Sequence, residues 1–462
     1  MTSIPPFPPA RRRVLRARIL LVCGVLLALA CERPSPPRGL ILVSIDTLRA
    51  DHLGTYGYDR PTSPQIDALA EDSIVFERML AHAPNTPPSH MSLLTGLLPV
   101  EHGVQGWVSP TKRDRLDPKH TTFAEILQRA GFATAASTAG GWMSPDLGFD
   151  RGFDEFHTRK RLSRSIDWAL DWLDARPEQR FFLFLHTYEV HAPYRAAPEH
   201  RALFVEAGYR PRWQPIPTTL GKVRRGEITL SDEDLRYFVN LYDAGIHQVD
   251  ATIGLLVEQL AARHVLDETI VVVTSDHGEE FLEHGSTGHW QLFNRPNLHV
   301  PFIVRLPRGT SGGRRITEYA QHVDFVPTML ELLGLPPHSA GHGRSWAAAM
   351  TGGPAPPARP ALAWSPRPRE QPQRSVIWQD HQLILNADTG ERLLFDLRED
   401  PLAQRDLAAS SPERVADLES YWRKWEPREK DAWPERPSPA TSTSYGDGLR
   451  RRLQALGYLE TE

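Results

Sequence analysis

Cysteine is nearly absent from this chain of 462 residues, which contains only Cys23 and Cys31. Both lie near the N-terminus, so the rest of the chain can form no disulfide, no four-cysteine zinc site and no cysteine nucleophile. An excess of positive charge is missing as well, because 57 acidic residues outnumber 53 basic ones and the formal net charge is −4. The composition therefore gives no support to nucleic acid as a partner.

Long hydrophobic runs are also scarce, and the clearest one lies near the N-terminus. Residues 19–30 are apolar, follow five arginines, and are too short to span a bilayer comfortably as a helix. Residues 28–30 (Ala-Leu-Ala) match a small-x-small cleavage pattern. We therefore predict that residues 1–30 are a signal peptide and that the protein is exported to the periplasm, the cell envelope or the medium. Cys31 then allows a lipoprotein anchor to a membrane; the alternative is an uncleaved membrane anchor.

Short apolar runs alternate with helical patterns from residue 39 onward. This alternation indicates an α/β fold with a large, mostly parallel or mixed sheet sandwiched by helices. Ligands of such sheets collect at the carboxyl ends of the strands. The predicted strands are 40–45, 181–185, 270–274 and 301–304, and the predicted helices are 122–130, 163–176, 235–263 and 323–333.

We predict two parts after the leader. The α/β domain spans residues 39–350, and residues 351–373, rich in Pro, Ala and Arg, are predicted to be a linker or surface loop. A small α+β subdomain with its tail follows at 374–462. Its predicted elements are strands at 375–385 and 392–397 and a helix at 412–425.

Metal-ligand residues follow two of the predicted strands. Asp46 ends the first one, and Asp276 and His277 end the strand at 270–274, where Gly278 permits a sharp turn. Carboxylate oxygens and imidazole nitrogens are common ligands of divalent cations. Taken alone, Asp46 is more often a helix cap or turn residue, and a histidine-containing loop is often an ordinary surface loop.

A threonine precedes two prolines at residues 86–88. Two prolines suit the first turn of a helix, so Thr86 should stand at the helix start, where free N–H groups and the helix dipole favour an anion. A hydroxyl held there beside a metal could attack a phosphorus or sulfur centre. The alternative is a plain N-cap threonine.

Two further histidines are candidates for the same site. His191 follows the very apolar strand at 181–185 and could hold a substrate oxyanion, bind a second metal or protonate a leaving group. His289 lies twelve residues after His277 in the same loop region. Asp243 and His247 share one helix face, but a hydrogen-bonded pair is favoured there over a metal site.

Together these motifs resemble the sulfatase family of the alkaline-phosphatase superfamily. The resemblance implies a divalent metal (Ca, Zn or Mn; one or two ions) held by Asp46, Thr86, Asp276 and His277. It implies Thr86 as the nucleophile, with His191 and His289 contacting the transferred group or the leaving group. The matching strings are ILVSIDTLRADHLGTYGY at 41–58, PSHMSLLTG at 88–96, HAPY at 191–194, SDHGE at 275–279 and LFDLREDP at 394–401.

The sequence departs from this family at its nucleophile. Sulfatases with known chemistry carry C-x-P-S-R or S-x-P-S-R, whose first residue becomes formylglycine. Thr86 cannot form that aldehyde, and His90 replaces the arginine. The chain is in this respect similar to relatives that use a threonine alkoxide on phosphodiesters, phosphonates or phosphoethanolamine groups. Thr47 replaces a second metal-binding aspartate found in many sulfatases.

We therefore expect a hydrolase of sulfate, phosphate or phosphonate esters, acting on a small molecule or on a glycan or lipid ester. One alternative is a phosphoethanolamine- or phosphoglycerol-type transferase acting on envelope glycans or lipids, although such relatives usually carry several membrane helices. Another is an inactive binding protein that retains the fold. Trp107, Trp142 and Trp290 could stack on a sugar ring, but packing is the commoner role of tryptophan.

Overall fold

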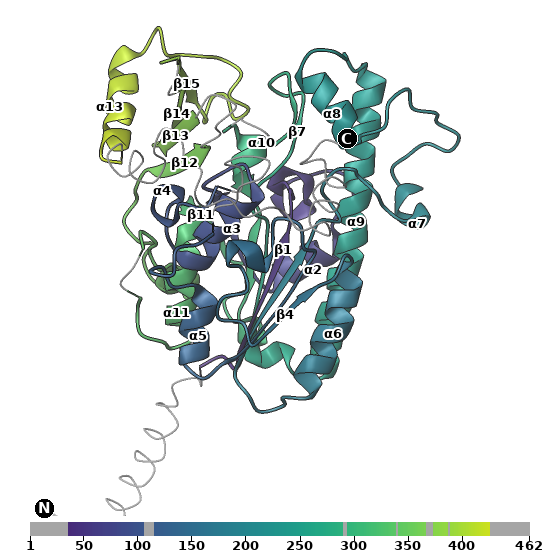
Figure 1. The fold of residues 1–462 in the computed structure, drawn as a ribbon, viewed down its shortest axis with the longest axis vertical. Coiled ribbons are helices and arrows are strands. Elements are labelled where there is room, and N and C mark those ends of the chain that lie inside the picture. The colour runs from purple at the N-terminus through teal and green to yellow at the C-terminus, as the bar shows by residue number, and fades with distance from the viewer. Residues whose placement is uncertain are drawn as a thin grey trace, which may run out of the picture. The chain divides into compact units, whose positions relative to one another are not determined.

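The computed structural model describes residues 36–105, 115–289, 293–338, 341–365, 373–386 and 389–425 (Figure 1). The predicted signal peptide, Cys31, Trp107, Trp290 and the tail beyond residue 425 lie outside the described residues. Among the described helices, none combines the length and the apolar character needed to cross a bilayer.

A nine-stranded mixed sheet lies at the centre, as the sequence predicts. Its strands are β1 (Gly39–Ile45), β2 (Ile74–Leu80), β3 (Ala133–Thr138), β4 (Glu155–Thr158), β5 (Phe181–Thr187), β6 (Thr269–Thr274), β9 (His299–Val300), β10 (Phe302–Arg305) and β11 (Arg315–Gln321). Their order is β11-β2-β10-β6-β1-β5-β3-β4, with β9 paired to β2. β1 runs parallel to β5 and β6, while β10 is antiparallel to both of its neighbours. The catalytic candidates on β1 and β6 therefore share one sheet edge.

Helices cover both faces of this sheet (Figure 1). Along β1, Leu40 and Leu42 belong to one hydrophobic core, and Ile41 and Val43 belong to the other, because successive strand residues point to opposite faces. The first core includes residues of α3 (Thr86–Thr95), α5 (Phe123–Arg129) and α11 (Phe325–Leu332). The second includes residues of α2 (Pro64–Glu71), α6 (Leu162–Asp174) and α9 (Asp232–Ala262).

Five strands of the central sheet, β2, β3, β4, β9 and β11, were not among the sequence predictions. β3 consists of alanine, threonine and serine, which have low hydrophobicity, and β4 is a short edge strand. β2 and β11 carry charged residues within their runs, as edge-proximal strands often do. Helix α9 also begins earlier than predicted, because Ser231 Oγ accepts a hydrogen bond from the Asp234 N–H and caps the helix.

The C-terminal region forms a separate antiparallel sheet and a helix. Its elements are β12 (Ala361–Ser365), β13 (Gln373–Trp378), β14 (His381–Asn386), β15 (Arg392–Asp396) and α13 (Pro412–Arg423). β12 lies inside the segment predicted as a linker, so that prediction is wrong for residues 361–365. The predicted strand at 375–385 is a hairpin whose turn residues, Gln379 and Asp380, have φ of 51° and 58°.

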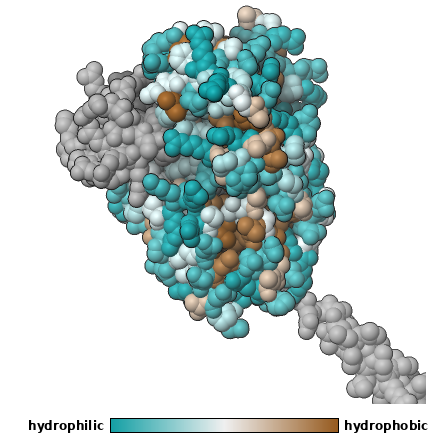
Figure 2. Space-filling view, turned by 90° about the vertical axis from the view of Figure 1, so that its right-hand side faces the viewer, coloured by the Kyte–Doolittle hydropathy of each residue, from teal (hydrophilic) through white to brown (hydrophobic). Residues whose placement is uncertain are grey.

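Smaller elements complete the described chain. A short hairpin pairs β7 (Glu280–Phe281) with β8 (Thr287–Gly288) just after the Asp276 loop. The remaining α-helices of the described residues are α4 (Pro99–His102), α7 (Pro198–Arg201), α8 (Pro217–Arg224), α10 (Arg295–Leu298) and α12 (Ala347–Met350), and short 3-10 helices lie between some of the elements. The face of the molecule in Figure 2 is mainly hydrophilic, with some apolar groups among the polar ones.

Candidate active site

Strand register brings the polar residues of three strands together. Ser44 of β1 pairs with His186 of β5 on one side and with Thr274 of β6 on the other. Asp46 follows β1 by one residue, and Asp276 follows β6 by two. The carboxyl edge of the sheet therefore gathers both carboxylates and His186, although they are separated by up to 230 residues in sequence.

Asp46, Asp276 and His277 form a compact set of three buried ligands. One ligand atom from each lies within 4.8 Å of the others. His277 Nδ1 donates to the Gly278 carbonyl at 2.9 Å, which leaves the Nε2 lone pair facing the carboxylates. Asp46 Oδ1 and Asp276 Oδ2 are buried and accept no hydrogen bond from the described residues. Buried, uncompensated carboxylate oxygens are costly, so this donor set fits a divalent cation.

The pKa values of the two carboxylates, Asp46 and Asp276, shift in opposite directions. Burial, together with the neighbouring Asp276, raises the pKa of Asp46 well above its ordinary value. Burial would raise the pKa of Asp276 also, but the histidines around it, His277, His90 and His186, lower it.

Thr86 reaches this ligand set from the first turn of α3. The helix begins at Thr86 with Pro87 and Pro88 behind it, as the sequence predicts. Thr86 Oγ1 donates to Asp46 Oδ2 at 3.1 Å and lies 3.5 Å from His277 Nε2. The structure therefore places the hydroxyl among the candidate metal ligands, while its role as a nucleophile stays a prediction.

Two buried histidines, His90 and His186, lie next to Thr86 and Asp46. His90, one helical turn later, has Nδ1 3.1 Å from the Thr86 carbonyl and Nε2 2.8 Å from Ser44 Oγ. His186 has Nε2 3.5 Å from Asp46 Oδ2, and its ring centroid lies 5.1 Å from that of His90. Burial lowers the pKa of both, so they are neutral at pH 7.

His186 is a site residue that the sequence analysis did not select. The signal that could have found it is positional: a histidine near the end of an apolar parallel strand, in register with the residue two before Asp46. Its pairing depends on strand order, which the sequence does not display.

His191 and His289 line the other side of the site. The His289 ring centroid lies 4.4 Å from that of His277 and 5.1 Å from that of His191. His289 Nδ1 lies 3.2 Å from Glu279 Oε1, a contact that orients the imidazole. Burial, together with His289, lowers the pKa of His191 to about 4, and burial raises that of Glu279 to about 7. Glu279 was seen in the sequence only as part of the SDHGE string.

Thr47 and Gly278 have roles that local sequence did not reveal. Thr47 adopts φ of 61°, and its hydroxyl donates to the Asp46 carbonyl, so it is turned away from the ligand set. Gly278 was predicted to permit a sharp turn. The structure instead requires glycine because a Cβ would lie 1.8 Å from the Pro296 carbonyl oxygen of α10. The Gly278 N–H donates to the Asn297 carbonyl at 2.9 Å, which fixes the metal loop to α10.

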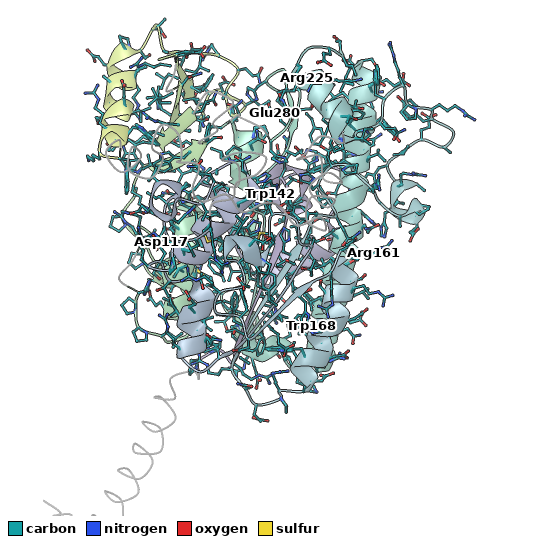
Figure 3. The ribbon with its side chains drawn as sticks, in the orientation of Figure 1. Asp117, Trp142, Arg161, Trp168, Arg225 and Glu280 are labelled. Atoms are coloured by element: carbon teal, nitrogen blue, oxygen red, sulfur yellow. The ribbon has the colours of Figure 1, made fainter. Side chains whose placement is uncertain are left out.

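Asp243 and His247 do not form a common site. Asp243 accepts hydrogen bonds from Tyr58 Oη and His52 Nδ1, both at 2.8 Å, whereas His247 Nδ1 faces His200 Nδ1 at 2.7 Å. Each residue is therefore hydrogen-bonded, but to different partners, so the predicted pairing of Asp243 with His247 is wrong. Trp142, labelled in Figure 3, is fully buried, so it packs in the core and offers no face to a sugar ring.

Comparison with known proteins agrees with this geometry. The family model described as Sulfatase matches residues 38–335. The N-sulphoglucosamine sulphohydrolase of Homo sapiens is 23% identical over 330 residues, which cover 68% of this chain and 64% of that protein. The multifunctional alkaline phosphatase superfamily protein PehA of Trinickia caryophylli is 24% identical over 489 residues, covering 84% of this chain and 94% of its own.

Solved structures show the same fold. The phosphonate monoester hydrolase of Agrobacterium radiobacter has a TM-score of 0.67 at 19% identity and covers 89% of this chain and 100% of its own. A protein solved in complex with its substrate D-glucosamine-2-N,6-O-disulfate has a TM-score of 0.73 at 19% identity, covering 87% of this chain and 100% of its own. The chain belongs to the sulfatase family, within the alkaline-phosphatase superfamily. It spans just under two thirds of the human sulphohydrolase's length.

Proposed function

We propose that this protein is a metal-dependent hydrolase of sulfate, phosphate or phosphonate esters that uses Thr86 as its nucleophile. The observation that carries the proposal is the position of Thr86 Oγ1, 3.1 Å from Asp46 Oδ2 and 3.5 Å from His277 Nε2. A hydroxyl at a helix start, inside a set of cation ligands, is suited to attack an anionic ester. Relatives described as sulphohydrolase and phosphonate monoester hydrolase support both ester classes.

Asp46, Asp276 and His277 would hold the metal, with Thr86 Oγ1 beside it. A divalent cation bound there would lower the pKa of the Thr86 hydroxyl and neutralise charge on the sulfuryl or phosphoryl oxygens. The Thr86 proton has an acceptor in place, because the hydroxyl already donates to Asp46 Oδ2. Without an aldehyde at this position, the attacking atom is a threonine oxygen, which favours phosphoryl chemistry at least as much as sulfuryl chemistry.

The reaction would proceed in two displacements. Thr86 Oγ1 bonds to sulfur or phosphorus while the bond from that atom to the ester oxygen breaks, leaving a threonyl ester. The departing alkoxide then takes a proton, and water later attacks the threonyl ester to release sulfate, phosphate or phosphonate and restore the hydroxyl.

His289 is the better proton donor of the two histidines near the leaving group. The Glu279 carboxylate beside Nδ1 stabilises a protonated His289 ring, as the carboxylate of a catalytic triad does. His191 donates its Nδ1 proton to the Ala192 carbonyl at 2.5 Å, and its pKa of about 4 keeps it neutral at pH 7. His191 is therefore suited to orient the substrate rather than to protonate it.

The proposal is tested with paired assays on an aryl sulfate, an aryl phosphate diester and an aryl phosphonate monoester. We expect Thr86→Ala to lose about 10³-fold or more of kcat on whichever ester is cleaved, because removal of a nucleophile removes the covalent path. Thr310→Ala, an exposed threonine, is the matched control, and Thr86→Ser should retain measurable turnover. Unchanged turnover by Thr86→Ala would refute the assignment, and wild type without stoichiometric metal or activity would indicate an inactive binding protein.

We also propose that the protein is exported, on the basis of the basic and apolar segments in residues 1–30. Expression of the full chain in a Gram-negative host should yield a processed form in the membrane or periplasmic fraction. Mass spectrometry of the N-terminal peptide would identify a lipid on Cys31. Cys31→Ala should abolish that modification, whereas Cys23→Ala, inside the leader, should not; a cytoplasmic, unprocessed chain would contradict the proposal.

A further inference from the structure

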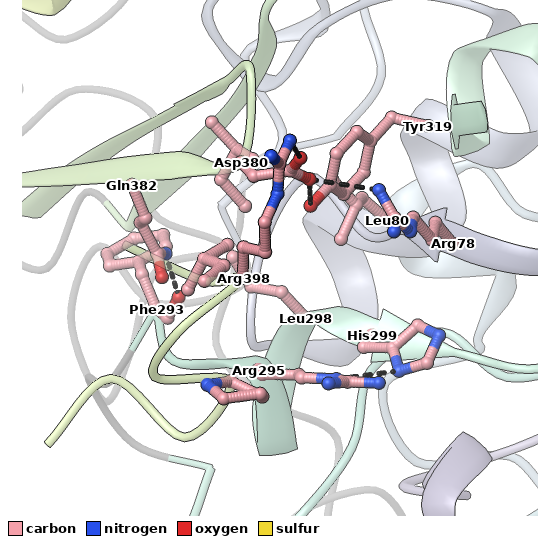
Figure 4. A pocket seen from close by; sticks show the side chains of 13 residues that line it. Arg78, Leu80, Phe293, Arg295, Leu298, His299, Tyr319, Asp380, Gln382 and Arg398 are labelled. Carbon is pink, nitrogen blue, oxygen red and sulfur yellow. Dashed lines mark hydrogen bonds and ion pairs between the residues drawn. The ribbon is translucent and has the colours of Figure 1, made fainter. Parts of the chain in front are cut away.

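A cavity lies between the central sheet and the C-terminal sheet, beside α10 (Figure 4). Its volume is about 270 Å³, and its walls come from β2, α10, β9, β11, the β13–β14 hairpin and the segment after β15. Although the Gly278–Asn297 hydrogen bond joins α10 to the metal loop, neither Thr86 nor any of the candidate metal ligands lines the cavity. The cavity is therefore distinct from the Thr86 site.

The middle of the cavity is apolar. Leu80 and Leu298 lie between its two polar ends (Figure 4), and Phe293 and Ile377 also line it. All four side chains are at most 6% exposed, so they form a fixed surface. Such a surface suits a ring or another compact apolar body.

One polar end is centred on Asp380. Its carboxylate accepts hydrogen bonds from Arg78 at 2.9 Å, from Arg398 at 2.9 Å and from Tyr319 Oη at 3.0 Å. Two guanidinium groups on one carboxylate leave a net positive charge at this end. The two guanidinium groups thus neutralise the negative charge of Asp380, so this carboxylate does not repel an anion elsewhere in the cavity.

The other polar end is Arg295, which lies opposite the Asp380 group in Figure 4. Its Nε donates to His299 Nδ1 at 3.4 Å, and His299 Nε2 in turn donates to the Glu77 carbonyl at 2.7 Å. Burial lowers the pKa of His299 to about 4, so this ring is neutral and can accept from Arg295. These two hydrogen bonds orient the Arg295 guanidinium through its Nε atom. Both of its Nη groups can then donate hydrogen bonds to a ligand.

No carboxylate among the described residues neutralises Arg295 by an ion pair. The nearby acidic groups have other partners: Glu77 binds Arg315 at 2.7 Å, and Asp51 binds Arg49 at 2.8 Å. A planar guanidinium with free donors beside an apolar wall is suited to bind a sulfonate, sulfate or phosphate group.

We propose that this cavity binds an organic oxyanion: one sulfonate, sulfate or phosphate group carried on a single small ring. The oxyanion contacts Arg295 Nη groups, and the ring packs against Leu80 and Leu298. The volume of about 270 Å³ is large enough to admit one ring with its anionic group.

The test uses 4-methylbenzenesulfonate, which carries no ester bond and is not hydrolysed. Calorimetric titration of the full chain, treated with chelator to disable the metal site, should show one site per chain. Arg295→Gln should weaken this binding by about tenfold or more, because a charge-assisted bidentate contact is lost. Arg225→Gln, at an exposed arginine that forms an ion pair with Glu227 at 2.6 Å and does not line the cavity, is the matched control and should bind as wild type does.

Two further measurements decide the outcome. Inorganic sulfate should bind about tenfold more weakly than 4-methylbenzenesulfonate, because it buries no ring. The Arg295→Gln variant should keep the kcat of wild type on any cleaved ester, which separates this site from the Thr86 site and shows that the variant is folded. Equal binding by Arg295→Gln and wild type, or equal affinity for sulfate and the ring-bearing sulfonate, would overturn the proposal.

Discussion

The Thr86 site and the cavity beside Arg295 share no residue, and they are built by different means. At the Thr86 site, the critical groups are buried, carboxylates and histidines predominate, and two carboxylate oxygens accept no hydrogen bond from described residues. At the cavity, arginines predominate and most of them are exposed at the rim. The comparison teaches that the same chain gathers buried carboxylates and histidines in one place and exposed arginines beside an apolar wall in another.

The largest expected effect concerns the cation at the Thr86 site. Asp276→Asn should abolish stoichiometric metal binding and lower kcat by about 10³-fold, because a charged ligand becomes a weak neutral one. Metal addition should raise the Tm of wild type. At a free metal concentration a hundredfold above Kd, the free energy of unfolding should rise by about 2.7 kcal/mol. Emission spectrometry for metal content and thermal melts with and without chelator provide the measurement; Asp267→Asn, at an exposed position, serves as control. Full metal content in Asp276→Asn would contradict the ligand assignment.

The contact between α10 and the metal loop can be tested at Gly278. A methyl group there would lie 1.8 Å from the Pro296 carbonyl oxygen, so Gly278→Ala must move either α10 or the metal loop. We expect a loss of about 1–3 kcal/mol in unfolding free energy, typical of overpacking, together with weaker metal binding. Gly285→Ala, where a Cβ meets nothing within 4 Å but φ is +76°, controls for backbone strain alone. If Gly278→Ala melted at the wild-type temperature, the close approach would not constrain the site.

Glu279 tests whether the orientation of His289 matters to the reaction. Glu279→Gln keeps the size of the side chain but removes the charge beside His289 Nδ1, and we expect kcat to fall by about 10- to 100-fold with little change in KM. The effect should be smaller for a substrate whose leaving group is a good one, such as 4-nitrophenolate, because such a group needs no proton. Equal losses for good and poor leaving groups would argue against proton donation. Glu268→Gln, at an exposed glutamate, is the control.

The smallest expected effect is on the pH dependence of stability, and it comes from a buried neutral histidine away from both sites. His102 Nδ1 accepts from the Val104 N–H at 3.0 Å, and burial lowers its pKa from 6.5 to about 3. Between these pH values the unfolded chain binds a proton that the folded chain does not, so stability present above pH 6.5 is lost as the pH falls. The slope is about 1.4 kcal/mol per pH unit for one histidine.

Denaturant unfolding between pH 7 and pH 4 measures this contribution. His102→Asn should be less stable than wild type at pH 7 but should show a shallower decline on acidification. His264→Asn, at an exposed histidine with φ of 58°, should decline in parallel with wild type. A parallel decline for His102→Asn would show that His102 does not titrate in this window.

Some of the fold and site can be predicted from local sequence because the information is local. The apolar runs of β1, β5 and β6 place Asp46, His191 and Asp276 just beyond strand ends, and the two prolines after Thr86 mark a helix start. The family resemblance added the order of these motifs. β3 was not predicted because its residues are only weakly apolar, and β12 was not predicted because it lies in a proline-rich segment. Both strands are stabilised by pairing with neighbouring strands.

What the sequence by itself determined is which chemical groups are available: carboxylates, histidines and one threonine at strand and helix ends, with no cysteine nucleophile. Tertiary structure decided which of these groups meet. His186 joins the site only because β5 pairs with β1, and Gly278 is needed only because α10 packs against the metal loop. Arg295 faces a cavity only because the C-terminal hairpin closes over it. Contacts between residues far apart in the chain follow from strand order and packing, which no local pattern of residues encodes.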